Sequence, residues 1–388
     1  MLQALVIASI GVAVLYLAAL TTAVVVLALR VGERDEDPVD DRQAFSASRL
    51  TIPVSIVVPV AAGARWADVA ATIDALLGLN YPAFEVIVVA DDLPHGAWDP
   101  TKAVWRLEAR EIFFRAWLDA APIRMMYRSA RDPRLIVVHK TPGSSADALN
   151  CGVNLAKFRY LCEVEPGITF DDDALLRAMT APLGDPADVV GATSHVEIRG
   201  GAFQRLRAVR SLMKSRVLWR HLEGVLGPRD AVVVWRRDAV EQAGGFSTSA
   251  TDPRLDMMVR LQHPRAGRIV RTAEVFGYRP ARSVVEDLRE TVRRQRAALE
   301  AASTLRAERS AIRPMLAYFF VSEMLTACAQ LWFIVATAFA AAAGWIPWAD
   351  AGWAVVLLAA GHAVVSAAAL LVRGAVSHAP EARDRAAA

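Results

Sequence analysis

Cysteine is scarce in this chain, with three thiols among 388 residues. Cys151, Cys162 and Cys328 have neither the paired spacing of a zinc site nor the even count of a disulfide framework. Such a sparse, odd set suits a reducing compartment. We therefore expect all three to be inert packing residues.

An excess of charge of one sign is also missing. The formal net charge is only +3. No block of lysine and arginine is interleaved with aromatic residues, as a nucleic-acid surface would require. These two absences exclude nucleic acid as an expected partner.

Hydrophobic residues, by contrast, are abundant. They make up 54% of the chain, which is high for a soluble protein of this size. Residues 2–29 carry no charge, and roughly 20 residues of helix already span a bilayer. A cleaved signal peptide would need a basic start and a shorter apolar core. We therefore expect a transmembrane anchor here.

Two further apolar segments lie near the other end of the chain, at about residues 314–343 and 353–372. A short turn joins them, and Trp345, Trp348 and Trp353 cluster around it as interfacial aromatic residues do. The sequence thus predicts three transmembrane helices.

Arginine residues indicate the orientation of these segments. They flank the ends that face residues 31–313 and the C-terminal tail, at Arg30, Arg34, Arg306, Arg309, Arg313 and Arg373. Positive charge stays on the cytoplasmic side. We expect a multi-pass protein of the cytoplasmic (inner) membrane, with membrane lipids as partners and its soluble domain in the cytoplasm.

Glu323 and His362 lie inside the second and third apolar segments. Ionisable side chains within a bilayer are costly and are candidates for function. The alternative, which we favour, is that they pair with each other or face the soluble domain.

Between the membrane segments, strand-like and helix-like patterns alternate. Buried strands are predicted at residues 54–60 and 84–89, with a helix at 66–79 between them. Residues 98–126 are rich in arginine and aromatic residues and are expected to be rich in helix. Strands at residues 135–139 and 160–164 flank a helix at 146–158.

This alternation predicts a sheet that is parallel at its core, with helices on both faces. In such sheets ligands bind beyond the carboxyl ends of the strands. Four carboxylates follow strands in this way, at Asp91, Asp92, Glu163 and Glu165. Their convergence is the first functional signal.

The motifs in this order resemble those of the membrane-bound family 2 glycosyltransferases. The matching segments include VSIVVPV, LLGLNYPAFEVIVVADD, TPGSSADALNCGVNLA, RYLCEVEPGITFDDDALL, WRRDAVEQAGGF, TDPRLDMMVRLQ and VRRQRAAL. The family includes the synthases of poly-N-acetylglucosamine, hyaluronan and cellulose. The resemblance implies a GT-A fold, an α/β architecture with a Rossmann-like mixed sheet that binds nucleotide-diphosphate sugars.

The resemblance also implies a division of the chain. Residues 1–30 would form the first transmembrane helix and residues 31–50 a linker. Residues 51–300 would form the glycosyltransferase-like domain. Residues 301–373 would hold a basic connector with two transmembrane helices, and residues 374–388 a cytoplasmic tail.

The Asp-x-Asp metal motif of this family corresponds here to Glu163-Val164-Glu165. Residues i and i+2 of an extended strand point to the same side, and their hard oxygens suit Mg²⁺ or Mn²⁺. The alternative is a solvated acidic turn. The acidic run that follows, Asp171 to Asp173, is better explained as an N-terminal cap of the next helix.

On the nucleotide side, the resemblance assigns donor binding to Pro59 and Asp91, with Asp92 as an alternative. The lysine of the family's glycine-lysine loop is replaced by Ser145, and Lys140 is expected to compensate from nearby. Gln295 remains from the Gln-x-x-Arg-Trp motif, and Arg296 beside it can meet a diphosphate. A solvated or lipid-facing basic helix is the alternative there.

The catalytic acid pair of the family falls on Pro253-Arg254, and an arginine accepts no proton at neutral pH. Asp252 and Asp256 are the candidate bases, with Asp252 preferred.

Three functions remain open. In the first, the protein transfers a sugar, with inversion, from a nucleotide-diphosphate donor to a glycan or lipid-linked acceptor in cell-surface polysaccharide synthesis. In the second, it is an inactive relative that acts as partner or scaffold of an active polysaccharide synthase subunit. In the third, it is a membrane-anchored module that binds a nucleotide sugar.

Overall fold

The computed structural model describes residues 1–32, 52–94, 96–199, 231–261, 267–280, 283–304 and 320–387. The chain divides into two compact units. The first comprises Met1–Asp37, Ala202–Leu226 and Ala311–Ala388, and the second Pro38–Gly201 and Gly227–Ser310.

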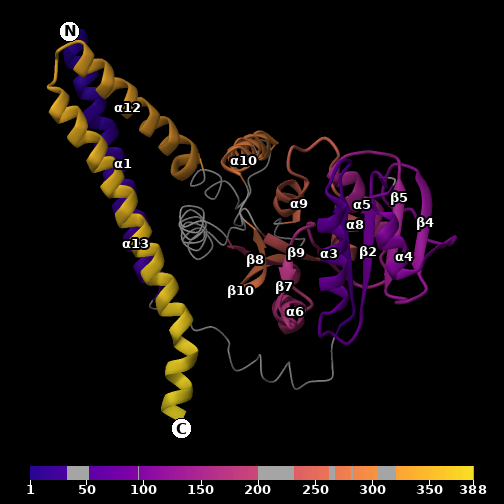
Figure 1. Ribbon diagram of the computed structural model, residues 1–388. Helices are drawn as coiled ribbons and strands as arrows, with labels where there is room; N and C mark the ends of the chain where they lie inside the picture. The colour runs from indigo at the N-terminus through magenta and orange to yellow at the C-terminus, as the bar shows by residue number, and fades with distance from the viewer. Residues whose placement is uncertain are drawn as a thin grey trace. The chain divides into compact units, whose positions relative to one another are not determined.

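The described residues of the first unit are mostly helical. It contains α1 (Leu2–Gly32), the π-helix η2 (Phe320–Leu325), α12 (Thr326–Ala342) and α13 (Trp348–Ala387). Figure 1 shows α1 (indigo) running beside α12 and α13 (orange to yellow), and all three contact one another. Side chains connect them as well: the Tyr16 hydroxyl donates to the Val321 carbonyl at 2.5 Å, and the Trp332 indole donates to the Ser9 hydroxyl at 3.2 Å.

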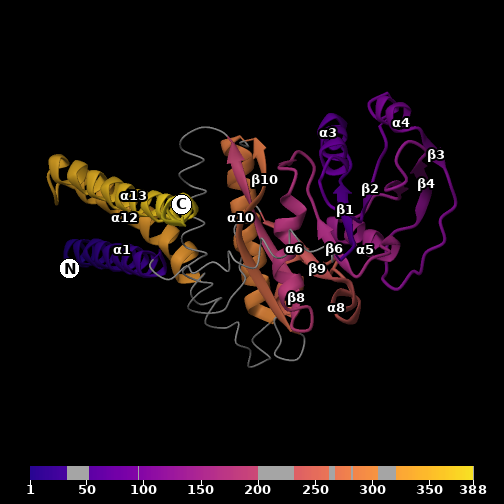
Figure 2. The same cartoon turned by 90° about the horizontal axis from the view of Figure 1, so that it is seen from below.

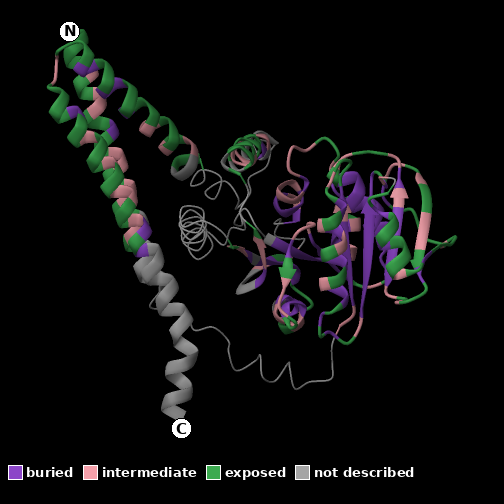
Figure 3. Cartoon of the chain, viewed as in Figure 1, coloured by how far each residue is buried: buried purple, intermediate pink, exposed green. Residues whose placement is uncertain are grey.

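Two stretches of this unit, Leu2–Ala23 and Trp348–Ala368, are long and apolar enough to cross a membrane. The apolar part of α12 is shorter, at Thr326–Ala342. Most described side chains of these helices are exposed (Figure 3), although they are aliphatic or aromatic. Such a surface is unfavourable in water and favourable in lipid.

His362 on α13 faces α12, where its Nε2 lies 3.3 Å from the Gln330 amide nitrogen. The side chain of Glu323 lies outside the described residues, so its expected pairing with His362 stays a prediction. In the described part of this unit, the polar neighbour of His362 is Gln330.

The second unit is built on a ten-stranded mixed sheet with the order β3-β4-β5-β2-β1-β6-β9-β8-β10-β7. Its core is four adjacent parallel strands, β5 (Leu135–Lys140), β2 (Phe84–Ala90), β1 (Val54–Val60) and β6 (Tyr160–Glu163). Their β-branched side chains are almost entirely buried (Figure 3). The four strands predicted from the sequence, and their parallel arrangement, are confirmed.

The remaining strands extend this core on both sides. On one side, β4 (Ile123–Ser129) and β3 (Leu107–Ala109) add in antiparallel order. On the other side, β9 (Ala231–Arg236) is antiparallel to both β6 and β8 (Val189–Arg199). The sheet ends with β10 (Arg268–Pro280), parallel to β8, and the two-residue β7 (Thr169–Phe170).

Helices cover both faces of the core strands, as predicted. On one face, α3 (Trp66–Leu77) packs with Ile56 and Val58 of β1 in the main hydrophobic cluster. On the other face, α5 (Ser145–Leu155) approaches β1 so closely that a Cβ on Gly152 would collide with the Val57 side chain. This close approach requires glycine. Because α5 follows β5 along the chain, the start of α5 lies at the carboxyl ends of the parallel strands.

The other helices of this unit are α4 (Asp99–Trp105), α6 (Ala174–Gly184), α8 (Arg237–Gln242), α9 (Pro253–Leu261) and α10 (Val284–Thr304). Helix α6 packs on β8 and β10, and α9 contacts α10. Figure 2 shows α6 beside β8 and β10, the strands that follow the parallel core.

The predicted helix-rich stretch at residues 98–126 is wrong beyond Trp105. Helix α4 ends at Arg106, which adopts a left-handed conformation with φ of 47°. The aromatic residues after it do not form the buried face of a helix, because Phe113 is fully exposed and Trp117 is 59% exposed. Residues 123–129 instead form β4, which pairs with β5 on one side and with the short β3 on the other. These tertiary contacts override the helical pattern of the local sequence.

Two of the cysteines are core residues as expected. Cys151 and Cys162 are buried, and burial raises the pKa of the Cys151 thiol to about 12. Cys328 is exposed on α12, so its expected role as a packing residue is wrong for the protein described here.

Candidate active site

Two clusters of charged residues lie at the carboxyl ends of the core strands. In each of them one cation is held between two carboxylates. We call the group of Asp91, Lys140 and Asp147 the closed cluster, and the group of Glu163, Arg254 and Glu165 the open cluster.

The closed cluster lies where β2 and β5 end. The ammonium group of Lys140 is 2.6 Å from Oδ1 of Asp91 and also forms an ion pair with Oδ2 of Asp147. The Lys140 side chain has no exposed surface. Burial lowers the pKa of Lys140, but its bonds to Asp147 and Asp91 more than offset this, so the pKa is raised overall. Lys140 is therefore a buried, charged and fully paired residue.

Local structure at the start of α5 positions Asp147. The Ser144 hydroxyl caps the helix by accepting from the Asp147 amide at 3.2 Å. Oδ1 of Asp147 accepts from the Ala121 amide. A Cβ on Gly143 would lie 2.6 Å from Oδ2 of Asp147 and 3.1 Å from the Lys140 nitrogen. The glycine therefore leaves room for the ion pair.

The open cluster lies where β6 ends. The Arg254 guanidinium donates through Nε to Oε1 of Glu163 at 2.6 Å. Through Nη2 the same group contacts Oε1 of Glu165 at 2.8 Å. Arg279 of β10 adds a longer contact of 3.8 Å to the second oxygen of Glu165. Glu163 and Glu165 thus point to the same side, as their spacing predicted, and one guanidinium joins them.

The members of the open cluster differ in exposure. Side-chain exposure is 4% for Glu163, 23% for Arg254 and 34% for Glu165. Burial raises the pKa of the Glu163 carboxyl, and the Arg254 charge partly opposes this rise. The second oxygen of Glu163, Oε2, is buried and has no hydrogen-bond partner among the residues that the structure describes.

Arg254 is fixed at the first turn of α9. Oδ1 of Asp252 accepts from the backbone amides of Arg254 and Leu255, at 3.1 and 3.2 Å, and so caps the helix. The preceding residue, Thr251, donates through its hydroxyl to Glu300 of α10 at 2.7 Å. Asp252 therefore stands directly beside the open cluster.

Asp256, the other candidate base, points into a different contact. It forms an ion pair of 2.8 Å with Arg260, one turn further along α9. Arg260 also donates to the carbonyl oxygens of Ala243 and Gly245, at 2.6 and 2.7 Å. This group of contacts connects α9 to the glycine pair that precedes Phe246.

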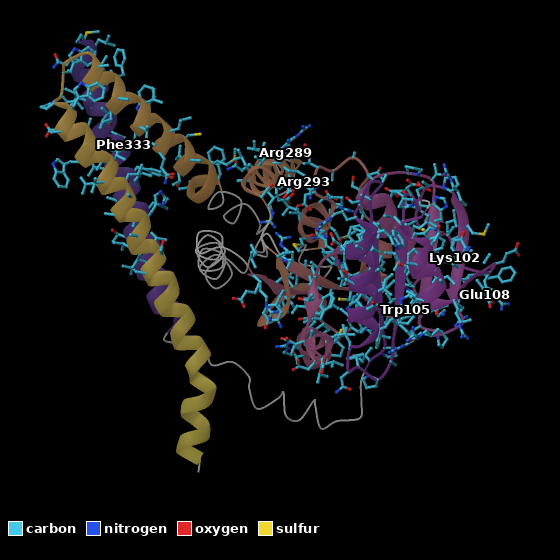
Figure 4. The ribbon with its side chains drawn as sticks, in the orientation of Figure 1. Lys102, Trp105, Glu108, Arg289, Arg293 and Phe333 are labelled. Carbon is cyan, nitrogen blue, oxygen red and sulfur yellow. The ribbon has the colours of Figure 1, made fainter. Side chains whose placement is uncertain are left out.

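The remaining predicted site residues belong to neither cluster, although Asp92 directly follows Asp91 of the closed cluster. Pro59 is half-buried in β1, and Asp92 is exposed just after Asp91. On α10, Gln295 is half-buried, and Arg296 forms an exposed pair of 3.1 Å with Glu300. Figure 4 shows that Arg289 and Arg293 also project from this helix, which is consistent with its expected basic character.

The structure thus brings Asp91 together with Lys140, and Glu163 together with Glu165 and the flanking Asp252. Sequence reasoning missed Asp147 and the bridging role of Arg254. It also missed Asn150, whose amide binds both the nitrogen and the oxygen of Phe246, at 2.8 and 3.0 Å. A signal for Asp147 existed, because it stands three residues after a capping serine.

Glu163 and Glu165 have the right chemistry for a divalent cation. Their carboxylate oxygens are hard donors, and Mg²⁺ is often bound by one or two carboxylates completed by substrate phosphates. Among the described residues, no group of three or more His, Cys, Asp or Glu side chains forms a complete metal site. The pair therefore fits a metal shared with a ligand, provided that Arg254 leaves the position between them.

A cavity of about 700 Å³ lies elsewhere, beneath the segment that joins β3 to β4. Its lining includes Arg110, Phe114, Leu118, Cys151 and Asn154. None of the predicted site residues lines it, although Ala121 does, and its amide binds Asp147 of the closed cluster. We assign the candidate active site to the charged clusters because they hold the carboxylates at the carboxyl ends of the strands.

No family profile and no curated protein matches the sequence. Solved structures do. The mannosyltransferase PcManGT from Pyrobaculum calidifontis, in complex with GDP-Man and Mn²⁺, is 18% identical. The match covers 94% of this chain and 97% of that one, with a TM-score of 0.60. This similarity shows the fold, and the expected α/β GT-A fold is confirmed.

Two further solved structures are similar over a smaller part of the chain. S. aureus TarS 1–349 is 15% identical, with 74% of this chain and 79% of that chain covered and a TM-score of 0.44. Glucosyl-3-phosphoglycerate synthase from Mycobacterium tuberculosis, in complex with Mn²⁺, UDP and phosphoglyceric acid, is 16% identical. There the coverage is 68% and 82%, with a TM-score of 0.39.

Proposed function

We propose that the protein is a membrane glycosyltransferase that transfers a sugar from a nucleotide-diphosphate donor to a glycan or lipid-linked acceptor. One observation carries this proposal. The acidic side chains of the open cluster lie at the carboxyl end of β6, beside the parallel core of a fold shared with a mannosyltransferase that binds GDP-Man. Ligands of open parallel sheets bind at such an edge.

Donor binding is assigned to the residues around the end of β2. Asp91 is buried in the closed cluster, and the exposed Asp92 follows it directly. Asp92 and the half-buried Pro59 are the parts of this edge that a nucleotide can reach. Lys140 would then act by fixing Asp91, because its own charge is already matched by two carboxylates. Gln295 and Arg296 of α10 are the proposed contacts to the diphosphate.

Glu163 and Glu165 are the residues that would hold Mg²⁺ or Mn²⁺, in agreement with the Mn²⁺ of the similar mannosyltransferase. Such an ion, when bound, neutralises the charge of the departing diphosphate. The role of this chain's own residues is to position the donor and to remove the proton of the acceptor hydroxyl.

Asp252 is the preferred base. It lies directly before the open cluster in the chain and uses only Oδ1 to cap α9. Asp256 is engaged by Arg260 through 2.8 Å contacts, so it needs a rearrangement before it can accept a proton.

We further propose that the protein spans the cytoplasmic membrane several times, with the sheet-bearing unit in the cytoplasm, and acts in cell-surface polysaccharide synthesis. Two sufficiently long apolar helices and the shorter apolar α12 support this placement. The basic residues that flank the apolar segments support the orientation.

A second function is favoured by one specific contact. Arg254 stands where a catalytic acid is expected and holds both glutamates of the expected metal pair. A relative that kept the fold without turnover, and that supports another synthase subunit, would have this arrangement.

The two functions separate in one experiment. The full-length protein in detergent is incubated with GDP-mannose, UDP-glucose or UDP-N-acetylglucosamine and Mn²⁺, and the released nucleoside diphosphate is measured. For an enzyme, Asp252→Asn lowers the rate by about 100-fold or more, the range typical of a general base. Asp173→Asn, at an exposed carboxylate of the loop before α6, leaves it unchanged.

Two results would contradict the enzymatic proposal. If a donor binds but no diphosphate is released, the inactive relative is the correct function. If no donor binds under any condition, neither transfer nor donor recognition takes place.

A further inference from the structure

Arg254 occupies the space in which a metal ion bound to Glu163 and Glu165 would have to sit. Its guanidinium contacts one oxygen of each carboxylate, at 2.6 and 2.8 Å. The planar guanidinium donates in a fixed fork, so one group can satisfy two carboxylates at once. The chain itself thus supplies one of the two positive charges that a divalent ion would bring.

Simultaneous occupation by both cations is unfavourable. A divalent ion added to this pair would place three positive charges against two negative ones, in a site where Glu163 is only 4% exposed. Like charges at such short range repel strongly where water is largely excluded. Arg254 and a divalent ion therefore compete for the same carboxylates.

Arg254 reaches solvent, in contrast to the cation of the closed cluster. Its side chain is 23% exposed, whereas that of Lys140 has no exposure. Its backbone is held by the Asp252 cap, so a change of partner requires the side chain to turn but no movement of α9. Oε2 of Glu163, which has no hydrogen-bond partner in the described part of the chain, is a further oxygen that a metal could use.

We propose that Arg254 is an internal cation that excludes divalent metal from Glu163 and Glu165 until a diphosphate draws it away. A diphosphate is a strong acceptor for guanidinium groups. Once Arg254 turns to the phosphates, both carboxylates lose its charge and can bind Mg²⁺ or Mn²⁺, while Arg279 stays 3.8 Å from Glu165. The competition between Arg254 and a divalent ion does not depend on the proposed function, whereas the step driven by diphosphate rests on it.

Metal binding, rather than activity, tests the competition. Full-length protein in detergent is titrated with Mn²⁺, and free Mn²⁺ is followed by its electron paramagnetic resonance signal. Arg254→Gln is expected to bind Mn²⁺ at least about ten-fold more tightly than the natural protein. Arg260→Gln is the matched control on the same helix, since Arg260 pairs with Asp256 instead, and it should not tighten binding.

A second titration tests the exchange. GDP or UDP should tighten Mn²⁺ binding by the natural protein and have a smaller effect on Arg254→Gln, whose carboxylates are already released. Adding Glu163→Gln to Arg254→Gln should abolish the gained Mn²⁺ site. Thermal unfolding with and without Mn²⁺ checks that Arg254→Gln is folded, and Mn²⁺ should stabilise it.

Equal Mn²⁺ affinity of the natural protein and Arg254→Gln would overturn the competition. Survival of the gained site in the double variant would overturn its location. Equilibrium dialysis of GDP and UDP separates the two proposals. If neither nucleotide binds, the proposed function and the exchange step are both wrong. The competition is decided separately, by the Mn²⁺ affinities of the natural protein and Arg254→Gln measured without nucleotide.

Discussion

The closed and open clusters use the same arrangement of charge in two different surroundings. Each holds one cation between two carboxylates at the end of the parallel strands. In the closed cluster, the side chains of Lys140, Asp91 and Asp147 are 0, 5 and 9% exposed. In the open cluster, Arg254 and Glu165 are 23 and 34% exposed.

This difference in exposure decides whether the ion pairs of a cluster can change partners. A buried ion pair that loses one partner leaves an uncompensated charge without water, which costs several kcal/mol. A partly exposed pair can exchange its partner for solvent, metal or a ligand at lower cost. The closed cluster therefore holds the strand ends and α5 together, while the open cluster is where ligand charge can enter.

The largest expected effect comes from breaking the closed cluster. Lys140→Met leaves Asp91 and Asp147 buried without their cation, so we expect a loss of about 3–5 kcal/mol of stability or a failure to fold. Urea unfolding of the detergent-solubilised chain, followed by tryptophan fluorescence, measures the loss.

The control for this variant is Arg296→Met, which breaks an exposed pair and should cost less than about 1 kcal/mol. If both variants unfold at the same urea concentration, the buried pairs of Lys140 contribute no more to stability than one exposed ion pair.

A smaller effect is expected in the open cluster. Arg254→Gln leaves the buried Glu163 with a weaker partner, so stability should fall by about 1–3 kcal/mol. Saturating Mn²⁺ should restore it, because the ion replaces the lost charge. The same urea experiment with added Mn²⁺ measures this recovery.

Lys140→Met should gain nothing from Mn²⁺, since its carboxylates are almost inaccessible. Recovery of both variants, or of neither, would remove the contrast between an open and a closed cluster.

The smallest effect concerns the border of the closed cluster. His139 precedes Lys140 and is half-buried, and burial together with nearby Arg124 lowers the pKa of its imidazole, against the opposing charge of Asp92. The unfolded chain binds a proton near pH 6.5, while the folded protein resists it. Stability should therefore fall as the pH drops below about 6.5 and be regained above it.

His139→Gln should flatten this dependence by less than about 1 kcal/mol between roughly pH 7 and pH 5.5. Urea midpoints at the two pH values give the comparison. A dependence that is unchanged in the variant would assign the titration to another group.

The core of the fold could be predicted because buried parallel strands consist of short β-branched runs. Residues 54–60 and 84–89 are such runs, so both strands were predicted, and in the structure they pair side by side. The segment at residues 106–126 could not be predicted, since its aromatic residues are exposed and its pairing with β5 is a tertiary contact.

The site could be predicted only in part. Glu163 and Glu165 were predicted from the i, i+2 periodicity of one strand, which is a local feature of the sequence. The partner of Glu163 is 91 residues away in the chain, and no local pattern connects them. The burial of Lys140 was also hidden, because lysine is almost never fully buried unless it is paired, and the partner Asp147 belongs to another element.

Gly143 and Gly152 give the closed cluster its dimensions. One leaves space beside the Asp147 carboxylate, and the other lets α5 lie close against β1. The position of the Asp147 carboxylate thus depends on two residues that carry a hydrogen atom where all others carry a Cβ. A single added methyl group at either position would change the electrostatics of the strand ends without altering any charged residue.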